Sequence, residues 1–575
     1  MDTIKSNMKP IQQKPLRLLP GVIIVIIQWL LWFVVPLFLE GDLVTMVRVF
    51  GGLAGGLAML VWWVFFSRAP WFDRLSAVFL MIASFIVTAQ FLDKSIATTM
   101  MGLMYLVYSV PFMCLAFLGW AVLSRNTSIG IRRSTMTATI IIAFGVWAFL
   151  RTEGMDAETH NEIVWRWAKS SEERMLARVD DKLKLMTLDS VSLSKEPEWP
   201  GFRGTNRDDI VHGTKIGSDW TKSPPVEMWR RPVGPGCSSF AIQGSLLFTQ
   251  EQRGEYEMVT CYDINTGELV WKHSNRARFW DSHAGAGPRS TPTIYNGRVY
   301  TLGGTGILNV LDERTGLVIW SRKAASDNDV KALTWGFAGS PMVVNDIVVV
   351  SLSGKPAGYD IANGKFRWTG SDGGNGYSSP HLVTIDSVPQ IILMSQAGAV
   401  SIDPVDGKQL WQYAWPVMDR ILQPAVIEGG DLLFEGEAKG LSRVKVSHNN
   451  GDWTVKELWK SAVMKQNFND FIIHKGYAYG YDGPAIACID IKDGSLKWRG
   501  APYRGFSILL ADQDQLLILT EKGELVMSEA TPERFKELGR IKSLKDRTWN
   551  HPALSGNILV VRNNKEMVAY KLPAY

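Results

Sequence analysis

The sequence predicts an all-β eight-bladed β-propeller of four-stranded antiparallel blades, preceded by an α-helical membrane domain of about five transmembrane helices. Two observations carry this prediction. A nine-residue pattern recurs through residues 195–575, and residues 1–151 consist mostly of long apolar stretches. A repeat of 20–50 residues is typical of solenoids and propellers, and an apolar run of about 20 residues can cross a bilayer. Residues 152–194 are expected to form a helical linker between the two parts.

The apolar stretches lie at 21–39, 49–66, 75–92, 98–123 and 134–150. Backbone polar groups in lipid must be satisfied within the segment, so these stretches should be helices. No carboxylate, lysine or histidine lies in the middle of any of them, and such groups usually mark ion or proton pathways. We therefore interpret the region as a lipid-embedded anchor, with quinone binding or transport as the alternative.

Basic residues give an orientation. Nine Lys and Arg lie before the first stretch, between the second and third, and between the fourth and fifth, against Arg48 and Lys94 on the other side. Lys and Arg are enriched in cytoplasmic loops. We therefore expect a cytoplasmic N-terminus in a bacterial inner (cytoplasmic) membrane. An odd number of spans would then place everything after Arg151 in the periplasm.

The linker is expected to contain an amphipathic helix. Within 157–179, Ile163, Trp167, Leu176 and Val179 fall near one helical stripe. Such a helix would pack on the propeller or lie at the membrane interface, or it would dock a partner.

The pattern Asp-x3-Gly-x3-Trp occurs five times without a gap. Its copies are Asp263, Gly267, Trp271; Asp312, Gly316, Trp320; Asp360, Gly364, Trp368; Asp403, Gly407, Trp411; and Asp490, Gly494, Trp498. Residues before each Asp read as a strand, Asp and Gly favour a tight turn, and the Trp ends the next strand. Each Trp should bury a large area against the neighbouring unit.

Counting Trp-equivalent positions predicts eight blades, because degenerate copies at Trp229, Trp459 and Leu538 fill the gaps. The first copy lacks preceding strands, and the last three strands lack a fourth. Residues 226–232 should therefore serve as the outer strand of the final blade and close the ring. Closure of this kind leaves only short sheet edges.

The repeat resembles the PQQ-like β-propeller repeat family, which includes quinoprotein alcohol dehydrogenases and the outer-membrane assembly lipoprotein BamB. The segments WPGFRGTNRDD (199–209), GPRSTPTI (287–294) and GYSSP (376–380) resemble its BamB-like branch. The resemblance covers about 195–575. It implies the fold, and it implies either a binding and assembly role or a quinoprotein dehydrogenase.

In a propeller, the loops entering the innermost strands converge on one mouth of the central channel, and loops on a rigid scaffold commonly carry function. We expect ligand-binding residues on these loops. They are His283, Arg289, Trp335, Tyr377, Arg420, Asn469, Asp470, Arg504, Trp549 and His551. The forked guanidinium of Arg289 suits a carboxylate or quinone oxygen. Asn469 and Asp470, together with Asn467, offer oxygen ligands of the kind that bind Ca²⁺.

Two functional hypotheses follow. The favoured one is a non-enzymatic binding or assembly scaffold for a protein or envelope partner, held at the mouth or along the blade edges. The alternative is a membrane-bound dehydrogenase that uses PQQ and Ca²⁺ and passes electrons from an alcohol or sugar to membrane quinone. Four scattered cysteines (Cys114, Cys237, Cys261 and Cys488) include no vicinal pair and no haem-attachment motif, which favours the scaffold.

Net charge and cysteine spacing argue against nucleic-acid binders and against proteins built on disulfides or zinc. The net charge is only +5, and much of the excess lies beside the apolar stretches, so nucleic-acid binding is not expected. The cysteine spacing indicates neither a disulfide framework nor a zinc site.

Overall fold

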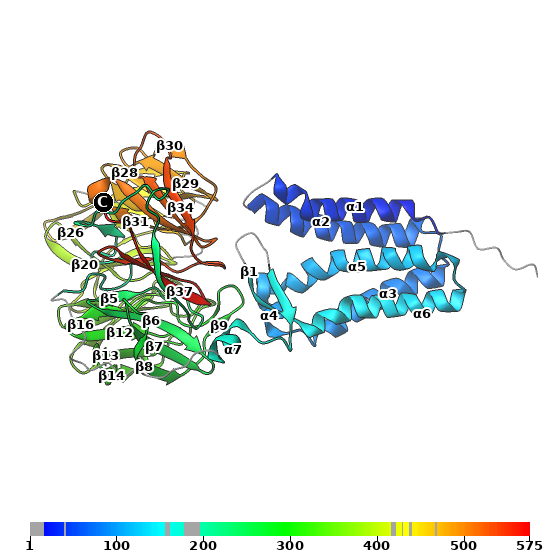
Figure 1. Ribbon diagram of the computed structural model, residues 1–575, viewed down its shortest axis with the longest axis horizontal. Helices are drawn as coiled ribbons and strands as arrows, with labels where there is room; N and C mark the ends of the chain where they lie inside the picture. Colours follow the sequence, from blue (N-terminus) through cyan, green and yellow to red (C-terminus); the bar gives the residue numbers. More distant parts are fainter. Residues whose placement is uncertain are drawn as a thin grey trace, which may run out of the picture. The chain divides into compact units, whose positions relative to one another are not determined.

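The computed structural model describes residues 16–38, 42–155, 161–177, 196–415, 421–427, 429–435, 440–465 and 468–575. The chain divides into two compact units, Met1–Ala168 and Lys169–Tyr575. The first unit is helical and the second is the propeller (Figure 1).

Five main helices of the first unit lie on the predicted apolar stretches. They are α1 (Leu19–Phe33), α2 (Asp42–Val61), α3 (Trp71–Ala89), α5 (Met104–Leu123) and α6 (Ile129–Gly145), with a short α4 (Lys94–Thr98) between α3 and α5. Four described helical segments are long and apolar enough to span a membrane: Val44–Phe66, Trp71–Ala89, Met104–Asn126 and Ile129–Phe149. α1 is shorter, at 15 residues. Pro36, three residues after the end of α1, has no backbone N–H to donate, so helical hydrogen bonding is interrupted there.

The helices of this unit pack closely through small and polar contacts. In α2, Gly55 lies against Gln28 of α1, so closely that a Cβ would come within 2.7 Å of the Gln28 side chain. Gln28 Nε2 donates to the Gly52 carbonyl at 2.7 Å. In the first turn of α3, the buried Asp73 binds Arg132 and Arg133 of α6, at 3.0 and 2.6 Å. These contacts fix α1 on α2 and α3 on α6.

The prediction of one amphipathic helix over 157–179 is wrong. Strands β1 (Leu150–Met155) and β2 (Asn161–Trp165) form an antiparallel hairpin instead. β-branched and aromatic residues such as Ile163 and Trp165 favour a strand there. A helix begins only after Ser170, whose capping box starts the six-residue α7 (Ser171–Leu176). Of the predicted stripe, Val179 lies outside the described residues.

Helix α7 packs on the propeller, to which it belongs. Its Met175 is buried. The Glu172 carboxylate accepts from the Gly254 N–H at 2.7 Å and binds Arg278 at 2.8 Å. This short helix therefore docks on the first blade.

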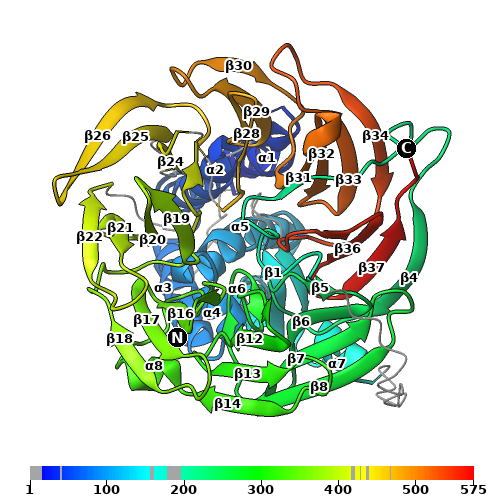
Figure 2. The ribbon, with the colours of Figure 1, turned by 90° about the vertical axis from the view of Figure 1, so that its left-hand side faces the viewer.

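The propeller has eight four-stranded antiparallel blades in a ring, as predicted (Figure 2). Blade 1 is β5 (Ala241–Gln243), β6 (Leu246–Arg253), β7 (Tyr256–Asp263) and β8 (Leu269–Arg276); blade 2 is β11 (Thr293–Tyr295), β12 (Arg298–Leu302), β13 (Leu308–Asp312) and β14 (Val318–Arg322). Blade 3 is β15 (Met342–Val344), β16 (Ile347–Leu352), β17 (Lys355–Asp360) and β18 (Phe366–Thr369); blade 4 is β19 (His381–Ile385), β20 (Val388–Ser395), β21 (Gly398–Ile402) and β22 (Gln409–Tyr413).

The remaining blades follow the same order from the centre outward. Blade 5 is β23 (Ala425–Val426), β24 (Leu432–Glu435), β25 (Leu441–Asn449) and β26 (Asp452–Ser461); blade 6 is β27 (Ile472–His474), β28 (Tyr477–Asp482), β29 (Ala485–Asp490) and β30 (Leu496–Arg499). Blade 7 is β31 (Gly505–Leu510), β32 (Gln515–Thr520), β33 (Glu524–Glu529) and β34 (Glu537–Lys542). Blade 8 is β35 (Ala553–Ser555), β36 (Ile558–Arg562), β37 (Glu566–Lys571) and β4 (Val226–Pro232).

The ring closes as the sequence predicts, because β4 pairs antiparallel with β37. Trp229 of β4 then donates its indole N–H to the Ile264 carbonyl of blade 1 at 2.7 Å. The fully buried Arg562 of β36 donates to the Gly234 and Gln250 carbonyls at 2.8 and 2.9 Å. The first and last strands of the propeller are thus joined by a sheet, an indole and a guanidinium.

At four junctions, those of Trp229, Trp271, Trp320 and Trp459, the repeat residues make the same two contacts. The Trp of one blade donates its indole N–H to the carbonyl of the residue after the repeat Asp in the next blade, as Trp271 does to Glu313 at 2.9 Å and Trp320 does to Ile361 at 3.0 Å. The indole also covers the repeat Gly of that next blade. At Gly316, which has φ +68°, a Cβ would lie 2.4 Å from Trp271. These junctions are therefore held by the same two residue types, whereas Trp368 covers Gly407 without an indole hydrogen bond among the described residues and Trp411 donates to Gln390 of its own blade.

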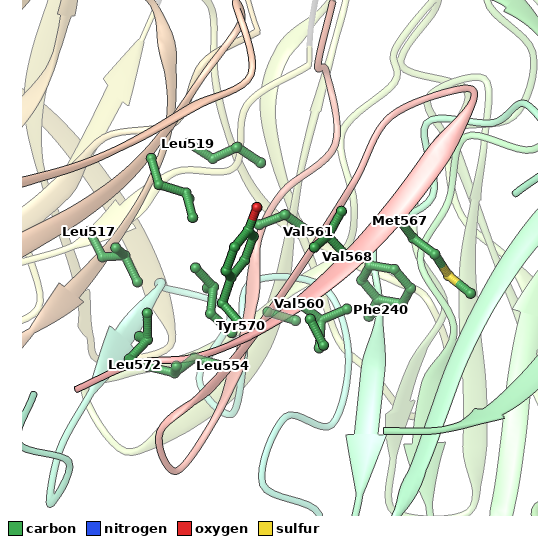
Figure 3. Packing of buried hydrophobic residues seen from close by; sticks show 14 of the residues in the cluster. Phe240, Leu517, Leu519, Leu554, Val560, Val561, Met567, Val568, Tyr570 and Leu572 are labelled. Atoms are coloured by element: carbon green, nitrogen blue, oxygen red, sulfur yellow. The ribbon is translucent and has the colours of Figure 1, made fainter. Parts of the chain in front are cut away.

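Apolar side chains fill the spaces between blades. Leu554, Val560 and Val568 of blade 8 pack against Leu517 and Leu519 of blade 7 in one continuous cluster (Figure 3). Successive side chains of a strand point to opposite faces of the blade, and both faces pack against neighbouring blades. This explains the runs of buried aliphatic residues in β32 and β36.

Candidate functional site

A segment outside the repeat crosses the centre of the ring; we call residues 199–211 the central segment. Trp199 exchanges backbone hydrogen bonds with Ile242 of blade 1, and the Pro200 carbonyl accepts from Ile294 of blade 2. At its other end, β3 (Ile210–Val211) pairs in parallel with β31 of blade 7. Its ends thus contact blades 1, 2 and 7, and its middle reaches the entrances of blades 3 and 4 through Arg207, so the segment lies across the central channel.

Arg207 anchors the middle of the central segment. Its guanidinium donates to the carbonyls of Ser340, Pro341 and Pro380, at the entrances of blades 3 and 4, with the Pro380 bond at 2.9 Å. Burial lowers the pKa of Arg207 to about 10. The side chain therefore stays cationic at neutral pH while its donors are directed to backbone oxygens.

The central segment also carries half of a buried ionic group. We call Arg203, Asp209, Asp470 and His551 the central ion cluster. Arg203 Nε binds Asp209 Oδ2 at 2.5 Å, and Arg203 Nη1 lies 3.3 Å from Asp470 Oδ1. His551 Nε2 lies 2.6 Å from Asp470 Oδ2. Blades 6 and 8 thus meet the central segment through charged side chains.

Burial governs the electrostatics of this cluster. It raises the pKa of Asp209 above the ordinary carboxyl value, outweighing the attraction of Arg203. Burial acts in the same direction on Asp470, but Arg203 and His551 together lower the pKa of that carboxyl below its usual value. Phe202 and Phe506 flank the His551 ring, with centroid distances of 4.9 and 4.0 Å.

His381 lies in the field of the two central arginines. Burial, followed by the charges of Arg203 and Arg207, lowers the pKa of His381 to about 3. The imidazole is therefore neutral at physiological pH, and its buried Nδ1 has no hydrogen-bond partner among the described residues.

The structure places nine of the predicted mouth residues on the loops that enter the innermost strands, while Arg420 lies outside the described residues, as does Asn467. Three of them come together. The Trp335 ring lies 4.9 Å from the Tyr377 ring and 6.5 Å from the His283 ring. These half-buried rings come from the entrances of blades 2, 3 and 4, and we call them the aromatic wall.

Arg289 differs from its expected role as an open anion-binding fork. It is buried and binds Asp281 and the Gly285 carbonyl, the latter at 2.7 Å. Asp281 in turn accepts from the His283 N–H at 2.7 Å. Arg289 therefore braces the small hairpin of β9 (Trp280–Asp281) and β10 (Gly285–Ala286), which presents His283.

The other predicted residues are engaged locally. Asn469 donates to the Gly505 carbonyl at 2.9 Å, and Arg504 Nε donates to the Gly483 carbonyl at 2.8 Å. Trp549 lies under the Arg547 guanidinium, 3.9 Å from ring centroid to Cζ. Of the predicted set, Asp470 and His551 belong to the central ion cluster.

Sequence reasoning missed Arg203, Arg207, Asp209 and His381 as site residues. One signal was available: residues 203–209 carry four charges within seven residues, immediately before an all-β repeat. Surface charge is the ordinary interpretation of such a stretch, and its burial depends on contacts with blades that lie far away in the sequence.

Three arginines at the centre and mouth of the propeller do not suit PQQ. Its three carboxylates need accessible Arg or Lys partners, but Arg203, Arg207 and Arg289 are each buried and bound to carboxylates or carbonyls of the chain itself. The central segment also crosses the channel that a cofactor on the axis would need. No chemical step is therefore assigned to PQQ.

The fold defines the class: an eight-bladed β-propeller joined in one chain to a unit of apolar helices of membrane-spanning length. Residues 218–391 match the family model described as outer membrane protein assembly factor BamB. This match supports the resemblance seen in the repeat.

Known relatives include enzymes. The chain is 28% identical over 145 residues to the quinohemoprotein alcohol dehydrogenase ADH-IIG of Pseudomonas putida, and this match covers 24% of the chain and 19% of the relative.

Solved structures of quinohemoprotein alcohol dehydrogenases from P. putida HK5 and Comamonas testosteroni superpose with a TM-score of 0.50 and 12% identity. They cover 66% and 71% of this chain, and 80% and 85% of their own chains are matched. BamB from Moraxella catarrhalis gives a TM-score of 0.43 at 14% identity, over 60% of this chain and 98% of that one. At these identities the likeness is one of fold.

Proposed function

We propose that this chain is a membrane-anchored periplasmic PQQ-like propeller that acts as a binding or assembly scaffold for an envelope partner. The observation that carries the proposal is the central segment, which crosses the channel and whose Arg203 and Arg207 are bound to carboxylates and carbonyls at the blade entrances. A mouth filled in this way offers a surface rather than a deep cofactor pocket. Surface recognition is the task of a scaffold.

The aromatic wall is the part of the mouth that we assign to the partner. Trp and Tyr dominate the energetics of protein interfaces because they bury large areas with few rotatable bonds. Trp335 and Tyr377 lie side by side on rigid blade entrances. A protein partner that inserts an apolar or cationic side chain against these rings would gain both area and a cation–π contact.

Cross-linking from defined positions tests this assignment. A photoreactive amino acid at Trp335 of the full chain in cells should give a discrete cross-linked species, and Tyr377→Ala should remove it. The matched control is the same probe at Tyr295, an exposed ring at the far end of innermost strand β11. Equal products from both positions, or none from Trp335, would refute a partner at the mouth.

The membrane arrangement is part of the proposal. The basic residues before α1 and between α2 and α3 favour a cytoplasmic N-terminus. With α1 counted as a fifth span beside the four longer ones, this orientation puts the propeller in the periplasm. A reporter enzyme that is active only in the periplasm should be active when fused after Tyr575 and inactive when fused before α1. The reverse pattern would overturn the orientation.

A further inference from the structure

The geometry points to a divalent transition-metal site at the centre of the propeller, formed by Asp209, Asp470 and His551. One carboxylate oxygen from each Asp and one imidazole nitrogen lie within 4.8 Å of one another. The three residues come from the central segment and from the entrances of blades 6 and 8. This inference is independent of the proposed scaffold role.

A second observation points to a missing ligand at this place. Asp209 is 1% exposed, and its Oδ1 has no hydrogen-bond partner among the described residues, whereas its Oδ2 is bound by Arg203. A buried acceptor without a partner costs about 1–3 kcal/mol, and more when it is charged. A cation bound to Oδ1 would satisfy it.

The donors are already arranged in two shells. Arg203 holds the outer oxygens, Asp209 Oδ2 and Asp470 Oδ1, and so leaves Asp209 Oδ1 and Asp470 Oδ2 for the ion. Outer partners of this kind orient ligands and tune metal affinity. With two carboxylates and one guanidinium, the site carries about one negative charge before a divalent ion binds.

Without a metal, the hydrogen between His551 and Asp470 occupies part of the position that the ion would take. His551 Nε2 and Asp470 Oδ2 are 2.6 Å apart and share one hydrogen. When the ion binds, both atoms donate lone pairs to it, and the imidazole then carries its proton on Nδ1.

The donor set selects the ion. One imidazole nitrogen with two carboxylate oxygens suits Zn²⁺, Co²⁺ or Mn²⁺, whereas Ca²⁺ takes six to eight oxygen ligands. Three protein ligands leave a coordination position open. Because 12% of the His551 side chain is exposed, that position can be reached from solvent, and it would accept water or an acidic group.

Cobalt and zinc titrations of the full chain in detergent, after chelator treatment, test the site. Co²⁺ should produce visible d–d absorption that saturates at about one equivalent. Calorimetry with Zn²⁺ should show about one bound ion. Asp209→Asn and His551→Ala should each weaken binding at least 100-fold, because each removes one of only three ligands.

The control is His474→Ala. His474 Nε2 also lies 2.6 Å from a carboxylate, Asp514 Oδ1, but Asp514 is half-exposed and belongs to no three-ligand group among the described residues. This variant should bind like the unaltered chain. Absence of Co²⁺ absorption in the unaltered chain, or equal affinity in Asp209→Asn, would overturn the proposal. Asp209→Asn preserves size, so it remains decisive if His551→Ala fails to fold.

Discussion

The guanidinium of Arg207 donates to the Pro380 carbonyl, 173 residues further along the chain, at 2.9 Å. This one bond ties the central segment to the entrance of blade 4. The bonds from Arg207 to the Ser340 and Pro341 carbonyls tie it to the entrance of blade 3. The centre of the propeller is thus a structural element in its own right rather than an open channel.

Arg207→Met should therefore destabilise the propeller strongly. The change keeps an unbranched side chain but leaves three carbonyl oxygens without their donor, at a cost of about 3 kcal/mol. Denaturant unfolding followed by tryptophan fluorescence would measure it. Arg314→Met, in an exposed turn of blade 2, should change stability by less than about 0.5 kcal/mol. Equal effects of the two changes would show that the central contacts contribute little.

The contact between Trp271 and Gly316 predicts a difference between two glycines. Gly316 and Gly297 both have positive φ, +68° and +71°, but a Cβ at Gly316 would meet Trp271 at 2.4 Å and one at Gly297 would meet nothing within 4 Å. Gly297→Ala should cost about 1 kcal/mol, for its backbone alone. Gly316→Ala should cost at least about 2 kcal/mol more, because the indole must move. Similar losses in denaturant unfolding would contradict the packing argument.

His381 predicts a specific acid sensitivity. Its folded pKa of about 3 lies below the ordinary value of 6.5, so below pH 6.5 the unfolded chain gains a proton that the folded chain does not. Stability should fall as pH decreases from about 6.5 toward 3, by about 3 kcal/mol at pH 4.

A neutral substitute isolates that contribution. His381→Gln cannot gain the proton, so its unfolding free energy should fall less steeply between pH 7 and pH 4 than that of the unaltered chain. Other acidic groups act equally in both chains and cancel in the comparison. Parallel pH profiles would mean that His381 is not held neutral.

Much of the fold could be predicted because its contacts repeat. At four junctions a Trp and a Gly make the same pair of contacts. Five clear copies of the pattern therefore sufficed for eight blades, and the missing strand at 226–232 identified the closure. The hairpin of β1 and β2 was missed because Ile163 and Trp167 also satisfy a helical stripe. The length of α1 was overestimated because hydropathy alone does not register where Pro36 interrupts helical bonding.

The candidate site could be predicted only in outline. Loop order placed Trp335, Tyr377 and His551 at the mouth, because strand polarity decides which loops share an end. It could not show that Arg289 is taken by Asp281, nor that Asp209 meets Asp470 and His551. The contacts of Asp209 join segments separated by hundreds of residues, and no local pattern encodes them.

Calorimetric titration of the full chain in detergent with PQQ and Ca²⁺ tests the scaffold account most directly. The engaged arginines and the filled centre predict no saturable binding in the micromolar range, while circular dichroism confirms a folded propeller. Saturable binding with a Kd below about 1 µM, equivalent to about 8 kcal/mol, would contradict the account and establish the quinoprotein dehydrogenase alternative as the one to pursue.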